Sequence, residues 1–173
     1  MRFIFILLAA LIFITPSYAC SDPPRDYFLY PNELLRKATG VVLAKVVSKE
    51  IIPAPRVPRP TFEEVQFKVI ENLSGPELKN PLTLKGIISE RGSNHFNNHE
   101  DYSFWASPFT ASGGIIGDCY AYGVFEKGKI YLIFLGIGNT KAFEEIADLK
   151  NDRWLAMVRD LINDQKTRNK IKN

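Results

Sequence analysis

Two histidines stand four residues apart in the segment 94–101, whose sequence is NHFNNHED. On a helix this spacing places both imidazoles on one face, with two carboxylates beside them, so His95 and His99 are candidate zinc ligands. The zinc-protease signature has a glutamate directly after its first histidine, but Phe96 stands there. The surrounding Asn, Gly and Ser residues favour turns. A metal site, and a hydrolase built on it, therefore competes with a packed surface loop whose histidines bond to the backbone. The loop is the favoured interpretation.

Residues 1–19 have the organisation of a signal peptide. Arg2 supplies a positive charge, residues 3–14 form an unbroken apolar run, and Ser-Tyr-Ala at 17–19 has the small-x-small pattern read by signal peptidase. The run is shorter than the roughly 20 apolar residues of a membrane span. We expect an exported protein, periplasmic or secreted, whose mature chain begins at Cys20 and is soluble. An uncleaved anchor is the alternative.

Cys20 and Cys119 are the two cysteines of the chain, so it can form one intramolecular disulfide. Outside the reducing cytoplasm an even number of cysteines usually pairs. The competing chemistry is lipidation of Cys20, which would make an envelope lipoprotein anchored to the membrane. A bacterial lipobox has an aliphatic residue three positions before the cysteine and a small residue two positions before it. Here those positions hold Ser17 and Tyr18, which match poorly. Lipidation would also leave Cys119 without a partner, so the disulfide is favoured.

The composition excludes a nucleic-acid-binding protein. The chain has 22 Lys and Arg against 19 Asp and Glu, a net charge of +3, and lacks the strong basic stripe that nucleic acid requires. Basic residues gather at 166–173, which we expect to be a solvated tail. Neither a Gly-x-Ser-x-Gly motif nor a clustered nucleophile, base and orienting residue is present. We therefore expect a binding or interaction module with a protein partner, not an enzyme, and no cofactor.

The pattern of apolar residues predicts a mainly β fold. A short helix is expected at 31–38, and a buried strand follows at 41–47. Proline-rich residues 53–60 form a loop because proline lacks the amide donor. Further strands are expected at 62–73, 82–88, 120–125, 129–135 and 141–147.

A C-terminal helix is capped by Asp152, and its apolar residues have helical spacing on one face. Short strands followed by a terminal helix favour a small β-barrel of five or six strands. The long connection 89–118 is rich in aromatic residues, and its glycine-rich end at 113–117 is expected to be a bend. The predicted organisation is one domain at 20–165, with the barrel at about 40–147, the terminal helix at about 152–165 and the tail at 166–173.

Three segments carry a resemblance to a known family, and they are ATGVVLAKVVSKE from position 38, FEEVQFKVIENLSGP from 62 and DCYAYGVFEKGKIYLIFLG from 118. Together with a mature start at Cys20, they resemble the inhibitory domain of the tissue inhibitors of metalloproteinases, within the netrin-like group. The resemblance covers roughly residues 20–138. It implies an OB-type barrel of five strands with flanking helices.

The resemblance also implies roles for individual residues. In the family the first cysteine is bridged to a cysteine just before the fifth strand, which corresponds to a Cys20–Cys119 disulfide. The inhibitors chelate the protease zinc through the α-amino group and carbonyl of that first cysteine, and the next residue, here Ser21, enters the specificity pocket. Asp22 replaces a second family cysteine, and two further disulfides are missing. The resemblance therefore implies the fold more strongly than inhibition of a zinc metalloprotease.

Overall fold

The computed structural model describes residues 30–53, 61–78, 80–88, 99–100, 105, 114–117, 120–138 and 140–172. The predicted signal peptide and four of the predicted site residues, Cys20, Ser21, His95 and Cys119, lie outside these residues.

Seven strands in the described residues form one mixed sheet in the order β4-β5-β3-β2-β1-β6-β7. The strands are β1 (Gly40–Ile51), β2 (Phe62–Ser74), β3 (Leu82–Ile87), β4 (Gly114–Gly117), β5 (Tyr120–Gly123), β6 (Ile130–Leu135) and β7 (Phe143–Glu145). All neighbours are antiparallel except β3 and β5, which run parallel and pair only at Gly86 and Gly123. The predicted mainly β fold is confirmed. The sheet is not closed in the described residues.

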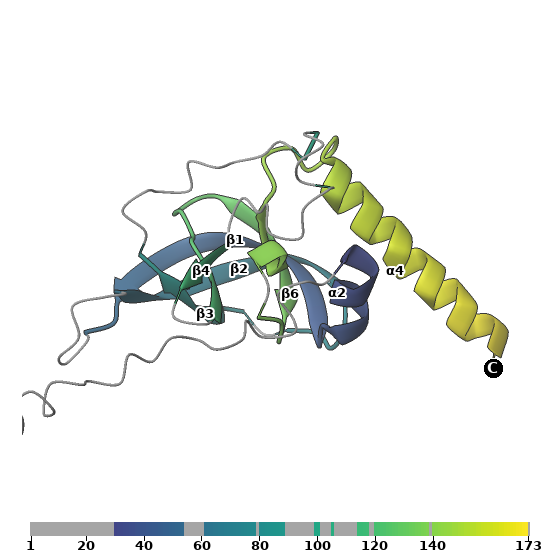
Figure 1. Cartoon of the computed structure of the whole chain (residues 1–173), viewed down its shortest axis with the longest axis horizontal. Coiled ribbons are helices and arrows are strands. Elements are labelled where there is room, and N and C mark those ends of the chain that lie inside the picture. Colours follow the sequence, from purple (N-terminus) through teal and green to yellow (C-terminus); the bar gives the residue numbers. More distant parts are fainter. Residues whose placement is uncertain are drawn as a thin grey trace, which may run out of the picture.

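Helices gather at one end of the sheet. Helix α2 (Pro31–Lys37) packs against α4 (Arg153–Lys172), and the 3-10 turn η3 (Thr140–Ala142) leads into β7. Figure 1 shows α4 running away from the strands, with its C-terminal half beyond the body of the molecule. The predicted short N-terminal helix and C-terminal helix are therefore confirmed. Among the described helices none is long and apolar enough to cross a membrane.

Strand β1 is the centre of the fold because it pairs with both β2 and β6. Its residues Gly40–Ala44 are all buried, as expected for an apolar run covered on both faces. Val41 and Leu43 face the helices, in a cluster with Trp154, Leu155 and other residues of α2, α4 and β6. This is called the outer cluster below.

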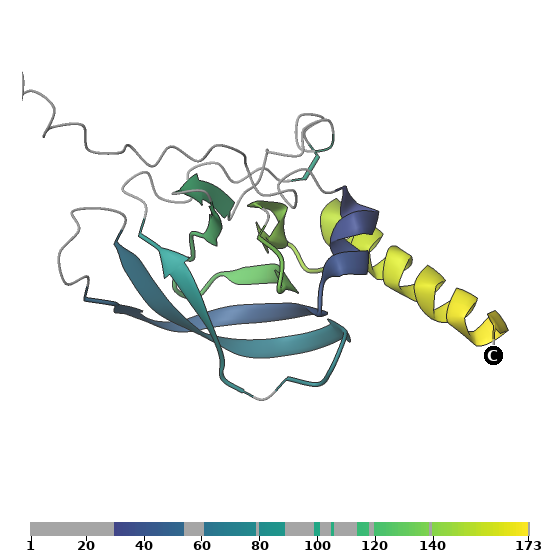
Figure 2. The same ribbon diagram turned by 60° about the horizontal axis from the view of Figure 1, so that its bottom comes forward.

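The opposite face of the sheet forms an inner cluster, which contains Val42, Ala44, Val46, Val65, Phe67, Phe125, Tyr131 and Ile133. The Phe125 ring meets Phe67 and Tyr131 edge to face, with centroids 5.0 and 5.1 Å apart. Figure 2 shows why this face is enclosed: β1 and β2 curve beneath the shorter strands. The curvature lets one sheet wrap its own apolar core.

Several sequence expectations differ from the structure. Residues 114–117 form strand β4 instead of a bend, because they pair with β5 and so satisfy their backbone. The strand expected at 141–147 is divided into η3 and the shorter β7. Helix α4 continues to Lys172 instead of ending near 165. No Gly or Pro interrupts that stretch, and its Lys and Arg residues favour a helix C-terminus through the helix dipole.

Two glycines on neighbouring strands make room for the buried Phe125 ring. Gly86 and Gly123 face each other in the parallel pair, and a Cβ added at Gly123 would overlap the ring atoms of Phe125. The ring is fully buried and touches aromatic neighbours on several sides, so it cannot move away cheaply. A side chain at Gly123 is therefore incompatible with the native position of Phe125.

We expect Gly123→Ala to lower the free energy of unfolding by about 2–3 kcal/mol through overpacking. Gly138→Ala is the matched control, because a Cβ there meets nothing within 4 Å. It should change stability by less than about 0.5 kcal/mol. Urea denaturation of the three proteins measures both values. Equal effects of the two substitutions would show that the Phe125 ring can move aside when a Cβ is added at Gly123.

Candidate functional site

His99 is the predicted site residue that the structure describes, and it is fully buried. Its Nδ1 atom lies 2.7 Å from Oδ2 of Asp152, and its Nε2 atom lies 3.3 Å from Oε2 of Glu144. Both carboxylates are themselves buried. The imidazole is thus held between two carboxylates, one on each ring nitrogen. His99, Glu144 and Asp152, together with the neighbouring Lys141, are called the buried ionic cluster below.

Different elements bring these side chains together. Glu144 lies in β7, opposite Leu132 of β6, so the sheet fixes its position. Asp152 precedes α4, where its Oδ1 atom accepts the Leu155 N–H at 2.8 Å. Asp152 is therefore the helix N-cap, as the sequence predicts, and its second oxygen is left to bind His99.

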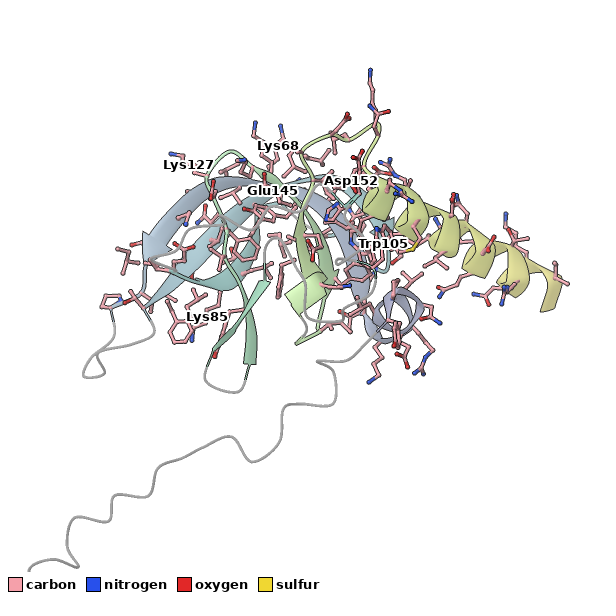
Figure 3. All side chains as sticks on the ribbon, turned by 45° about the horizontal axis from the view of Figure 1, so that its top comes forward. Lys68, Lys85, Trp105, Lys127, Glu145 and Asp152 are labelled. Carbon is pink, nitrogen blue, oxygen red and sulfur yellow. The ribbon has the colours of Figure 1, made fainter. Side chains whose placement is uncertain are left out.

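The backbone of His99 is fixed as firmly as its ring. The residue has a φ of 57°, in the left-handed region that most side chains avoid. Its carbonyl accepts the Trp105 indole N–H at 2.9 Å, and the Trp105 ring meets Trp154 of α4 at 5.8 Å. Figure 3 shows Trp105 and Asp152 near the start of α4. The long connection is thereby bound to the sheet and to the helix at one place.

The environment favours the charged form of His99. Burial alone lowers its pKa, but the hydrogen bonds and negative charges of Asp152 and Glu144 raise it more, so the pKa rises from 6.5 to about 9. Geometry gives the same answer, because only an imidazolium can donate from both nitrogens at once. His99 is therefore an imidazolium at neutral pH.

Lys141 adds a second buried cation. It is 3% exposed, and burial lowers its pKa, while the charge of Glu144 acts in the opposite direction. Lys141 thus interacts electrostatically with Glu144, the carboxylate that also faces Nε2 of His99. Such balance is what makes buried charges tolerable, because an unpaired charge in the interior is strongly destabilising.

The geometry assigns the cluster a structural role. Both His99 nitrogens face carboxylates within the protein, so the ring offers no lone pair to activate a nucleophile or to bind a metal. No group of three His, Cys, Asp or Glu side chains in the described ranges could hold a metal ion. His95 lies outside those ranges, so the two-histidine metal site stays a prediction. That site requires a His99 nitrogen to bind the metal, whereas here the two nitrogens face Asp152 and Glu144.

The partners of His99 were not identified from the sequence as a group. The sequence predicts Asp152 as a helix cap and places Lys141 and Glu144 in the expected strand at 141–147, with no link to His99. A signal existed: Glu144 and Glu145 are adjacent carboxylates in an otherwise apolar segment. Both are buried, and Glu145 accepts a hydrogen bond from Lys129 at 2.8 Å. Adjacent acids in a buried strand require partners on both faces of the sheet.

Comparison with known proteins leaves the family undetermined. No protein-family model matches the chain, and no curated protein matches it.

The pKa of His99 predicts how stability depends on pH. The folded-state value lies above the unfolded value, so the stabilisation is complete below about pH 6.5 and is lost as the pH rises through about 9. We expect the stability difference between the wild type and His99→Gln to shrink over that range by on the order of 1–3 kcal/mol.

Urea denaturation at pH 6.5, 8 and 9.5 tests this expectation. The difference between the two proteins is the useful quantity, because the lowered pKa of Lys141 makes its own contribution rise with pH. The ring resonances of His99 should also titrate by NMR with a midpoint of about 9. A stability difference that is constant across the range would contradict a charged His99 in the buried ionic cluster.

Substitution of Asp152 separates its two roles. Asn is a good helix cap, so Asp152→Asn keeps the bond to the Leu155 N–H but removes the charge beside His99. We expect a lower His99 pKa by NMR and a lower stability than the wild type. Asp152→Ala should cost about 1 kcal/mol more, because the cap is lost as well. The exposed Asp160→Asn is the charge control, and an equal effect there would refute the assignment.

Proposed function

We propose that this chain is an exported, non-enzymatic binding domain of the netrin-like type, which presents the start of its mature chain to a protein partner. The partner class that the resemblance implies is a zinc metalloprotease. In this proposal the sheet is an OB-type barrel, and Cys20 is bridged to Cys119. The α-amino group and carbonyl of Cys20 meet the protease zinc, and Ser21 enters the specificity pocket.

The curvature of the sheet is the observation that carries the proposal. One face encloses the inner cluster, and the other is covered by α2 and α4, which agrees with a small barrel that has helices on its outside. The turn η3, which leads into β7, also contacts β4 and β5. The two ends of the strand order thus approach each other, as barrel closure requires.

The buried ionic cluster supports binding over catalysis. Its side chains are those from which acid–base sites are built, yet its histidine is 0% exposed and bonded on both nitrogens. A substrate would have to displace a carboxylate to reach the ring. The cluster is better suited to fix His99 and Trp105 against β7 and α4, and rigidity in a scaffold lowers the entropic cost of binding.

The state of Cys20 tests the proposal, and N-terminal mass spectrometry of the exported protein reads it directly. A free α-amino group with the Cys20 thiol bridged to Cys119 is the expected result. A diacylglyceryl adduct would exclude chelation and favour the lipid-anchored alternative. Stoichiometric zinc that is lost in His95→Ala would favour the metal-site alternative instead.

Inhibition assays then test the mechanism. We expect the native protein to inhibit at least one member of a panel of zinc metalloproteases. One extra alanine before Cys20 should abolish the effect, because it converts the chelating amine into an amide and fills the space beside the metal. An alanine added after Asn173 is the matched control and should leave inhibition unchanged. Equal potency of the two extended forms would reject the chelation model.

A further inference from the structure

A groove opens between the second half of β2 and α4. It has a volume of about 190 Å³ and is lined by Glu71, Asn72, Leu73, Arg159, Ile162, Asn163 and Lys166. Leu73 and Ile162 are buried members of the outer cluster, so they give the groove an apolar floor. The remaining lining side chains are charged or are amides. The groove thus combines a small apolar base with a polar rim.

The rim of the groove carries a net positive charge. Arg159 donates to Oε2 of Glu71 at 2.6 Å, in an ion pair whose side chains are both more than one-third exposed. Lys166 is exposed and forms no ion pair within the described part of the chain. Two cations therefore meet one carboxylate, and Lys166 is available to a ligand.

The cationic rim continues along one side of α4. Arg159, Asn163, Lys166 and Lys170 follow each other at intervals of four, three and four residues, so they share one face of the helix. Residues 163–170 are all exposed, and Figure 1 shows this part of α4 projecting beyond the sheet. Arg168 lies two residues after Lys166 and therefore points to the opposite side of the helix.

The strand beside the groove has a free edge. Strand β3 pairs with β2 only from Phe62 to Phe67, so in the described residues the rest of β2 has no strand on that side. Val69 donates its N–H to the side chain of Asn80 at 2.7 Å, and the groove residues 71–73 follow directly. An open strand edge presents backbone donors and acceptors to an extended chain.

We propose that this groove binds an extended acidic segment of a partner protein, which lies along β2 with its carboxylates on Lys166 and Arg159 and an apolar side chain over Leu73 and Ile162. Charge complementarity sets the acidic character of the segment. The strand edge sets its extended form. This contact uses neither Cys20 nor Ser21, so it goes beyond the proposed function.

The shape of the site favours a polypeptide over an anionic membrane. A lipid surface is broad and would meet the exposed helix extension from any side, so Arg168 would contribute as much as Lys166. The groove is concave and uses one face of α4 only. Binding to a membrane should therefore depend on Arg168 as much as on Lys166, whereas binding of a polypeptide should depend on Lys166.

Fluorescence anisotropy with a labelled peptide of alternating Asp and Val tests the proposal. Lys166→Gln should weaken binding by up to about fivefold, the range of one exposed ion pair. Arg168→Gln removes the same charge from the opposite face and should change affinity by less than about twofold. A peptide with Lys in place of Asp should not bind.

Removal of Glu71 should act in the opposite direction. Glu71→Gln frees Arg159 and removes a competing carboxylate, so the acidic peptide should bind more tightly, by about twofold to fivefold. Glu64→Gln is the matched control, because Glu64 is an exposed carboxylate on the same strand outside the groove. It should leave the affinity unchanged.

Three results would overturn the proposal. They are no binding of the acidic peptide at millimolar concentration, equal losses in Lys166→Gln and Arg168→Gln, and binding to phosphatidylglycerol vesicles that both substitutions weaken alike. The last result would assign the helix extension to a membrane surface. An alanine added before Cys20 should not alter peptide binding, so failure here is distinguishable from failure of the proposed chelation.

Discussion

The rest of the structure depends on the burial of one imidazolium. Because His99 has no access to water, each ring N–H needs an acceptor within the protein, and here both acceptors are carboxylates. Strand β7 fixes the position of Glu144, and the start of α4 fixes the position of Asp152. One side chain thus determines where the last strand, the last helix and the long connection meet.

Asp152 links this charge balance to the course of the helix. It caps the first turn with one oxygen and binds His99 with the other, so the residue that stabilises the start of α4 also fixes His99. Apolar residues from Trp154 to Ile162 then keep the helix on the outer face of the sheet. Beyond Ile162 the helix leaves the body, and the groove beside β2 exists because of that departure.

The local elements could be predicted from the sequence, and the site could not. Alternation and apolar runs locate β1, β2, β3 and β6, since burial of one or both strand faces leaves a direct trace in residue order. Strand β4 was missed because its four residues are stabilised by pairing with β5, which periodicity does not record. The length of α4 was underestimated because an exposed polar helix carries no apolar signal.

For a related reason, the sequence predicts His99 as a site residue but does not predict its partners. His99 was singled out for its spacing from His95, which is a local property of the chain. Its actual partners lie 45 and 53 residues away, in elements that only the tertiary fold brings together. The sequence marks both of them as acids near apolar residues, but pairing between distant charges leaves no pattern in a single chain.

Strands β3 and β5 pair at one position only, so the backbone hydrogen bonds that join β4 and β5 to the rest of the sheet are few. On one side β1, β2, β3 and β6 are joined by long antiparallel ladders. On the other, β4 and β5 have one backbone pairing to β3, and side-chain packing and contacts with η3 supply the rest of their attachment. Local opening of a protein follows such seams, because little backbone pairing is broken there. We therefore expect the β4–β5 pair to open more readily than the larger sheet. Amide hydrogens in that pair should then exchange faster than those in the centre of β1, which we expect to exchange only on global unfolding.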